Sequence, residues 1–141
     1  MRHLVIISPW ITSPPGESSF SALLDLIRAK RITTYVVTRS PASTAHLDCV
    51  ERLSSCPSVE VIFNDNVHAK VLVCIAPSPH AFALIGSANM TVNSESLYEI
   101  GVLIVGEGTG SQIVHQLGDF GTSHLRTRPE SKVYKKIVVR R

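Results

Sequence analysis

Apolar runs of five or six residues alternate with segments of helical periodicity in the first half of the chain. The runs are rich in Val, Ile and Thr, which favour extended backbone, and they predict buried strands at residues 3–7, 33–38 and 59–63. The segments between them repeat apolar residues every three or four positions after a Ser or Thr. We therefore expect helices over residues 18–30 and 43–53. Strands that alternate with helices are typical of an α/β protein.

Three apolar runs follow one another closely in the second half of the chain. They predict strands at residues 67–75, 81–85 and 98–105, and a final helix is expected over residues 110–125. The inward face of that helix is predicted to consist of Ile113, Leu117 and Phe120. We therefore expect residues 1–141 to form a single α/β domain in which helices flank a mixed central β-sheet.

The composition favours a folded protein that neither enters a membrane nor binds a metal. Of the 141 residues, 44% are hydrophobic and 18% are charged, which is too apolar for a disordered chain. The first apolar run ends at Ser8, far short of a membrane span or a signal peptide. Three cysteines without a CxxC pair favour free thiols over disulfides or a zinc site. We expect a cytoplasmic location, no membrane insertion, and no metal or other cofactor.

The positive charge of the chain is concentrated at its end. Residues 126–141 contain seven basic residues and one acid, a net charge of +6, whereas the remainder carries −3 and the whole chain +3. A cluster of this kind favours a polyanionic partner such as DNA, RNA or acidic lipid headgroups. A solvated last strand with basic flanks explains the same cluster without any partner.

The strand predicted over residues 67–75 begins with two side chains that suit a phosphate. His68 and Lys70 are two residues apart, so in a strand they point the same way. An imidazole offers a nucleophile or a proton carrier, and an ammonium group offers a fixed positive charge. By itself His-x-Lys is a weak motif, because a histidine at a strand end beside an outward-reaching lysine gives the same pattern.

A polar turn follows the next predicted strand. Gly86 permits a close approach of the backbone. Ser87 and Asn89 are again two residues apart and offer uncharged donors for the oxygens of a phosphate. An ordinary turn that caps a helix is the alternative interpretation of these residues.

A single carboxylate lies in the apolar run over residues 98–105. Glu99 needs a polar partner if this run is a buried strand. We expect that partner to be His68 or Lys70, and a bond between Glu99 and His68 would fix the tautomer of the imidazole. An exposed strand end is the alternative position for Glu99.

Together these segments resemble the signature of the phospholipase D superfamily. That signature is His-x-Lys, then four intervening residues and Asp, then a Gly-Ser-x-Asn turn and a later Glu. The matching residues here are His68, Lys70, Gly86, Ser87, Asn89 and Glu99, while Ile75 stands where the signature has Asp. The resemblance extends over about residues 3–125 and implies a phospholipase D-like fold.

The resemblance implies a metal-independent phosphodiesterase. Members of the superfamily form a phosphohistidine on one histidine, and a histidine from a second motif protonates the leaving oxygen. Because this chain has one His-x-Lys, the resemblance implies a homodimer with its active site on the two-fold axis. His68 of the two copies would be nucleophile and general acid. Lys70 and Asn89 would bind the phosphate, Ser87 would assist, and Glu99 would orient His68.

Three hypotheses about the function follow from these features. A nuclease acting on DNA or RNA is favoured, because the basic end suits a nucleic acid and short single-motif relatives often act on nucleic acids. A phospholipase or phosphatidyl transferase ranks lower, since the sequence shows no acyl-chain groove or amphipathic membrane helix. Ile75 in place of the acid favours a third hypothesis, an inactive module that binds phosphate or nucleic acid. Trp10 is expected in the core or at a strand end rather than stacked on a base.

Overall fold

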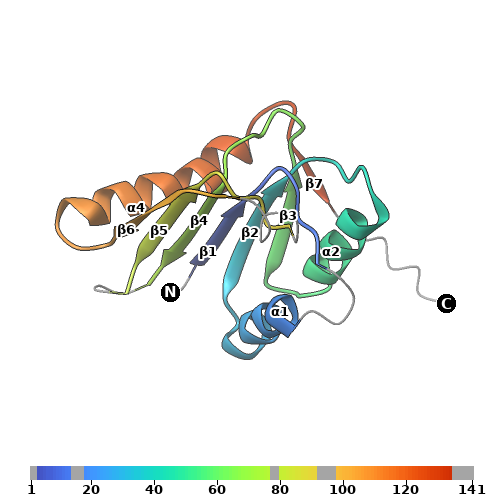
Figure 1. The fold of residues 1–141 in the computed structure, drawn as a ribbon, viewed down its shortest axis with the longest axis horizontal. Helices are drawn as coiled ribbons and strands as arrows, with labels where there is room; N and C mark the ends of the chain where they lie inside the picture. The colour runs from blue at the N-terminus through green and yellow to red at the C-terminus, as the bar shows by residue number, and fades with distance from the viewer. Residues whose placement is uncertain (1–2, 14–17, 77–79, 92–97, 135–141) are drawn as a thin grey trace.

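The computed structural model of the chain describes residues 3–13, 18–76, 80–91 and 98–134. The elements within these ranges are shown in Figure 1. In chain order they are β1 (His3–Ile7), α1 (Ser18–Lys30), β2 (Thr33–Thr38), α2 (Thr44–Ser54), β3 (Val59–Phe63), β4 (Val71–Ile75), β5 (Phe82–Gly86), β6 (Gly101–Val105), α4 (Thr109–Asp119), the π-helix η1 (Phe120–Leu125) and β7 (Lys132–Tyr134).

The strands of the described residues form one mixed sheet in the order β6-β5-β4-β1-β2-β3-β7. Strands β1, β2 and β3 are parallel neighbours. On one side β4, β5 and β6 continue the sheet as antiparallel neighbours, and on the other side β7 is antiparallel to β3. The predicted α/β class with a mixed sheet flanked by helices is confirmed.

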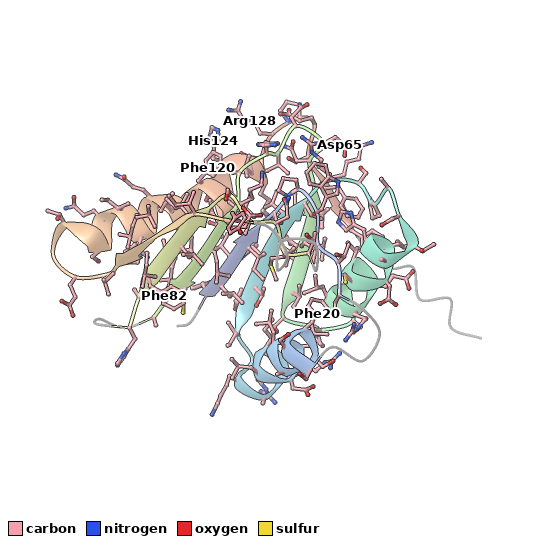
Figure 2. All side chains as sticks on the ribbon, in the orientation of Figure 1. Phe20, Asp65, Phe82, Phe120, His124 and Arg128 are labelled. Atoms are coloured by element: carbon pink, nitrogen blue, oxygen red, sulfur yellow. The ribbon has the colours of Figure 1, made fainter. Side chains whose placement is uncertain are left out.

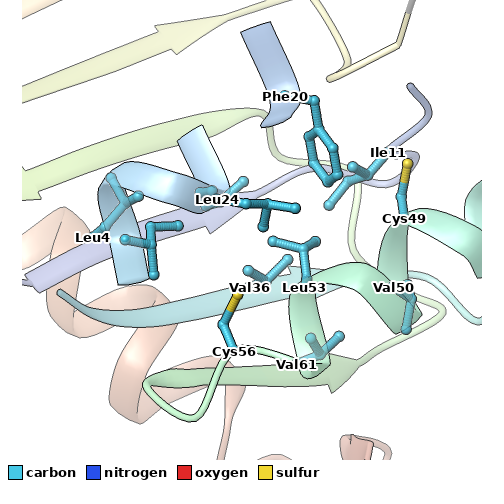
Figure 3. Close-up of a cluster of buried hydrophobic side chains, with 12 residues drawn as sticks. Leu4, Ile11, Phe20, Leu24, Val36, Cys49, Val50, Leu53, Cys56 and Val61 are labelled. Atoms are coloured by element: carbon cyan, nitrogen blue, oxygen red, sulfur yellow. The ribbon is translucent and has the colours of Figure 1, made fainter. Parts of the chain in front are cut away.

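Helices cover both faces of this sheet (Figure 1). Helices α1 and α2 pack on one face, and α4 with η1 packs on the other. Strand β1 alternates between the two cores, because Leu4 and Ile6 face α1 and α2 whereas Val5 and Ile7 face α4 and η1. Figure 3 shows the first core, where side chains of β1, β2 and β3 meet those of α1 and α2.

On the α1 side, the part of the sheet formed by β4, β5 and β6 is less well covered. The register aligns Leu72 of β4 with Leu84 of β5 and Leu103 of β6, so these side chains share that face. Leu84 is 42% exposed and Leu103 is 62% exposed. We call this surface the open face; it consists of Leu72, Phe82, Leu84, Leu103 and Val105. A cavity of about 950 Å³ lies over its inner part.

The first three strands and both early helices lie where the pattern predicted them. The strands have the predicted bounds, and Ser43 caps α2 by accepting a hydrogen bond from the His46 amide at 3.2 Å. The apolar residues that repeat along α1 form its inner face, since Phe20, Leu24 and Ile27 are buried and Leu23 is half-buried against the same core. Sharp breaks in the sequence, such as Ser8-Pro9 after β1, explain why these boundaries were predictable.

The strand predicted over residues 67–75 begins later, at Val71. The amide of Val67 donates to the Asn64 carbonyl at 3.1 Å, and the Val67 carbonyl accepts from the Arg39 guanidinium at 2.9 Å. These bonds hold Val67 in a turn and outside the ladder. Strand β4 is fully buried on one face only, because Leu72 on the open face is half-buried.

The strand predicted over residues 98–105 begins at Gly101. The Ile100 amide donates to the hydroxyl of Ser87 at 3.1 Å, so a side chain replaces the backbone acceptor that a ladder would supply. Strand β5 is shifted by one residue from the predicted range 81–85 and ends at Gly86.

The last helix differs in its inward face. It comprises α4 and continues as η1, and its buried residues are Val114, Gly118, Gly121 and Leu125. Leu117 and Phe120, predicted to point inward, are half-buried against the second core, but Ile113, also predicted inward, is 44% exposed. Gly118 explains the difference, because a Cβ at this position would lie 2.6 Å from Cδ1 of Ile75. The helix approaches the sheet closely on its glycine side, which turns Ile113 outward.

Candidate functional site

The topology brings all the predicted site residues to one edge of the sheet. Strands β1, β2 and β3 end at this edge, and so does β5, whereas the antiparallel strands β4 and β6 begin there. Figure 2 shows Asp65, which follows β3, at this edge and Phe82, which begins β5, at the opposite edge. The segments before β4, after β5 and before β6 therefore meet, and they contain the candidate residues.

His68 and Lys70 are in contact just before β4. The Lys70 ammonium group donates to the carbonyl oxygen of His68 at 3.1 Å, and Nζ lies 3.5 Å from Nδ1 of the imidazole. His68 is exposed and Lys70 is half-buried. An accessible imidazole beside a cation is suited to meet a phosphate from solvent.

The turn after β5 is bonded to both neighbouring segments. The Gly86 amide donates to the Lys70 carbonyl at 3.1 Å, and the Ser87 amide donates to the Ile100 carbonyl at 3.0 Å. A Cβ at Gly86 would lie 3.1 Å from the Ile100 carbonyl oxygen, so this close approach favours glycine. The turn thus joins the His-x-Lys segment to the segment that precedes β6.

Glu99 is positioned by Ser87. Its side chain is exposed and precedes β6, so the prediction that it lies inside an apolar strand is wrong and the exposed strand end is correct. The Ser87 hydroxyl donates to the Glu99 carboxylate. Among the described residues of one chain, Ser87 is the hydrogen-bond partner of Glu99, and the expected bond to His68 is not formed.

Three of the predicted residues line the cavity beside the open face. Lys70, Asn89 and Glu99 contribute to its wall, together with Gly86. The Asn89 Oδ1 atom is buried and has no hydrogen-bond partner among the described residues. This oxygen is an acceptor without a partner, so it is available to a hydrogen-bond donor in the cavity. The site therefore offers a cation, an amide and a carboxylate at one opening, with His68 against Lys70 and Ser87 against Glu99.

Arg39 also belongs to this edge, although no local motif indicated it. Its guanidinium lies 4.9 Å from the centroid of the Trp10 ring, and its Nε donates to the carbonyl of Val67, the residue before His68. The available signal was topological, because Arg39 follows the second strand, and ligands of α/β proteins bind at the carboxyl ends of parallel strands.

A buried histidine supports the backbone beside Trp10. Nε2 of His46 lies 3.0 Å from the Thr38 hydroxyl, which in turn donates to the Pro9 carbonyl at 3.2 Å. The hydroxyl has one proton to donate, so Nε2 of His46 carries the proton of the neutral ring. Burial lowers the pKa of His46, which is consistent with a neutral imidazole beneath this loop.

A fixed negative charge lies farther along the same edge. The backbone amide of Ser40 donates to Asp65 at 2.8 Å and its hydroxyl donates at 3.1 Å. These bonds hold the pKa of Asp65 below its usual value.

The described part of the basic segment is partly neutralised. The Arg126 guanidinium donates to the Glu60 carboxylate at 2.5 and 3.2 Å, and Arg128 lies 2.7 Å from the His124 ring. Lys132 begins β7, so a strand is present as the alternative interpretation predicted. Four of the seven basic residues lie beyond residue 134, outside the described residues.

The described residues contain no group of three His, Cys, Asp or Glu side chains that could hold a metal ion. Cys49, Cys56 and Cys74 form no disulfide bond within the part of the chain that the structure describes. No described helix is both long and apolar enough to cross a membrane.

The sheet order, its two helical layers and the edge that carries His-x-Lys, Gly-Ser-x-Asn and Glu define a phospholipase D-like α/β fold. Nuc from Salmonella typhimurium, a phospholipase D family member, has a similar structure with a TM-score of 0.70 at 12% sequence identity. The similarity covers 95% of this chain and 82% of that one. The predicted phospholipase D-like fold is confirmed.

Two further solved structures share this fold. NucT from Helicobacter pylori has a TM-score of 0.64 at 14% identity, over 89% of this chain and 79% of that one. Polyphosphate kinase from Porphyromonas gingivalis has a TM-score of 0.59 at 15% identity, over 84% of this chain and 21% of the larger enzyme. No known family model and no curated protein matches the sequence.

Proposed function

We propose that this chain is a metal-independent phosphodiesterase of the phospholipase D superfamily that cleaves nucleic acid. One observation carries the proposal: three segments distant in sequence place Lys70, Asn89 and Glu99 around one cavity, with His68 exposed beside Lys70. A cation and an amide suit the non-bridging oxygens of a phosphodiester, and the imidazole supplies a nucleophile.

The reaction proceeds in two displacements. Nε2 of His68 attacks phosphorus and forms a P–N bond while the bond from phosphorus to the leaving oxygen breaks. That oxygen takes a proton from a second imidazole. Water then attacks phosphorus and gives its proton to the second imidazole, the P–N bond breaks, and His68 is released with a phosphate monoester as product.

Ser87 acts on the carboxylate rather than on the phosphate. Its hydroxyl donates to Glu99 and accepts from the Ile100 amide at 3.1 Å, so its proton is already used. Ser87 therefore fixes Glu99, and Glu99 is the carboxylate that stabilises the positive charge of an imidazole during the reaction.

The second imidazole comes from a second copy of the chain. Each chain has one His-x-Lys, so a homodimer with the site on its two-fold axis supplies both histidines. The open face offers the surface for this copy, because the cavity beside it is lined by Lys70, Asn89 and Glu99. A partner that brings His68 to this cavity also covers the exposed Leu84 and Leu103.

A lipid substrate is the second candidate function, and the same cavity favours it. Its wall includes Leu72, Phe82 and Leu84, so the structure offers an apolar groove that the sequence did not show. A phospholipase or phosphatidyl transferase would place acyl chains there. Parallel assays with single-stranded DNA and with phosphatidylcholine vesicles separate the two functions, and faster turnover of the vesicles would replace the nuclease.

Cleavage in the presence of excess EDTA tests the chemistry. We expect the purified chain to cleave a single-stranded oligonucleotide under these conditions, and His68→Ala to abolish cleavage. His115→Ala is the matched control, because His115 is an exposed residue of α4 remote from the motif, and we expect it to keep full activity. Activity that requires a divalent metal, or that survives His68→Ala, would refute the mechanism.

A further inference from the structure

The loop that contains Trp10 bridges the two halves of the candidate site. On one side, the Ser8 hydroxyl accepts from the Met90 amide at 3.1 Å and donates to the Trp10 carbonyl at 2.8 Å. The Thr12 amide donates to the Met90 carbonyl at 2.8 Å. Because Met90 follows Asn89, these bonds fix the loop directly beside the predicted phosphate-binding amide.

The other side of the loop is tied to the predicted nucleophile through Arg39. The Arg39 amide donates to the Pro9 carbonyl at 3.2 Å, and its Nε donates to the Val67 carbonyl at 2.9 Å. Val67 is the residue before His68. The guanidinium therefore stacks over Trp10 while it is anchored beside His68.

We propose that Trp10 and Arg39 form a nucleotide subsite next to the cleaved phosphate, a proposal that rests on the proposed nuclease function. A nucleobase stacks on the Trp10–Arg39 pair, and the guanidinium binds the adjacent phosphate. Trp10 is 37% exposed, so part of the indole is accessible. The two Nη groups of Arg39 make no hydrogen bond with the described residues, so they can bind an anion in addition to the electrostatic interaction of Arg39 with Asp65.

The chemistry of this pair suits a nucleotide better than a lipid headgroup. Every base presents a flat π-face, and stacking on an aromatic side chain is the main sequence-independent contact of proteins with single strands. A guanidinium stacks on aromatic rings and also binds phosphate through paired N–H groups. A choline headgroup is itself cationic and would be repelled by Arg39. The pair thus favours single-stranded nucleic acid as the substrate.

Fluorescence tests the subsite directly, because Trp10 is the only tryptophan of the chain. The protein is the full chain with His68→Ala, so that the probe is not cleaved. We expect a short single-stranded oligothymidylate to quench the fluorescence in a saturable manner. An abasic oligomer of equal length, which keeps the phosphates and lacks the bases, should bind without this quenching. Binding of oligothymidylate with no change in the emission of Trp10 would overturn the subsite.

Kinetics provide a second readout on the chain that retains His68. We expect Trp10→Ala to raise KM for the oligonucleotide about tenfold with a smaller effect on kcat, and Trp10→Phe to restore most of the loss. Cleavage of the abasic oligomer should be unaffected by Trp10→Ala. If Trp10→Ala lowers cleavage of both substrates equally, the loop has only a structural role and the subsite is wrong.

The contribution of Arg39 is tested by a matched pair of charge deletions. We expect Arg39→Ala to raise KM for the oligonucleotide and to weaken its dependence on salt. Arg28→Ala removes the same charge from the end of α1. This end lies close to the start of β2 and so near the opposite edge of the sheet. We expect Arg28→Ala to change neither KM nor its dependence on salt. If all these variants cleave the oligonucleotide as the wild-type chain does, the subsite is wrong and the proposed nuclease function still holds. Quenching without cleavage by the wild-type chain would support the subsite and overturn the nuclease.

Discussion

Mixing the wild-type chain with a His68→Ala chain tests whether the active site is shared between two copies. In the proposed dimer both imidazoles act on one phosphate, so a dimer with one altered chain lacks either its nucleophile or its acid. Only dimers of two wild-type chains are then active. Their share of random dimers is the square of the wild-type fraction.

The expected magnitudes separate the shared site from an independent one. With equal amounts of the two chains, a shared site retains about one quarter of the activity of the undiluted wild type, and with one wild-type chain in four it retains about one sixteenth. Chains that act alone would retain about one half and one quarter. The difference is twofold in the first mixture and fourfold in the second.

The assay requires complete exchange of chains. The two proteins are unfolded together in urea, refolded at constant total concentration, and assayed for initial cleavage of an oligonucleotide in EDTA. A mixture with His115→Ala controls for losses on refolding and should keep the activity of the wild type. A linear dependence on the wild-type fraction would refute the shared site, and the second imidazole would then have to come from elsewhere in the same chain.

Two further predictions concern the open face and the buried histidine. Leu84→Glu should convert the proposed dimer to folded monomers and abolish cleavage, because the side chain is 42% exposed in one chain and the second copy would cover it. Leu47→Glu, on α2, should leave the proposed dimer intact, as light scattering after size exclusion would show. The pKa of His46 is lowered in the folded chain and is about 6.5 in the unfolded chain, so between these two values the unfolded chain binds more protons. The free energy of unfolding in urea should therefore fall as the pH drops through this window. His46→Gln should remove this dependence of stability on pH.

The fold was predictable where a local signal marked the end of an element. Strands β1, β2 and β3 are apolar runs rich in β-branched residues that stop before Ser8-Pro9, Arg39-Ser40-Pro41 and Asn64, and their bounds agree with the prediction. Strands β4 and β6 start four and three residues later than predicted, because distant side chains bind the first residues of the predicted ranges. Arg39 binds the Val67 carbonyl and Ser87 binds the Ile100 amide. Contacts between residues so far apart in sequence leave no periodic signal.

The segments that form the site were predictable from their motifs, but the positions of the individual side chains were not. Lys70 and Asn89 line one cavity, whereas His68 and Ser87, their neighbours at two-residue spacing, are not among its lining residues. The partner of Glu99 depends on the register between β5 and β6, which sets Ser87 beside it. Arg39 has no motif of its own, and only the sheet order shows that the end of β2 lies close to the start of β4.

The position of Ile75 bears on whether the chain is an enzyme or an inactive binding module. Ile75 follows Lys70 by five residues. At about 3.3 Å per residue it lies about 16 Å from Lys70 along the strand, toward the opposite edge of the sheet. There Ile75 packs against Gly118 of α4 as part of the second core. A side chain at this position does not reach a phosphate held by Lys70. The replacement of the signature's acid by Ile75 therefore removes no group from the site, and the intact His68, Lys70, Asn89 and Glu99 favour catalysis over binding alone.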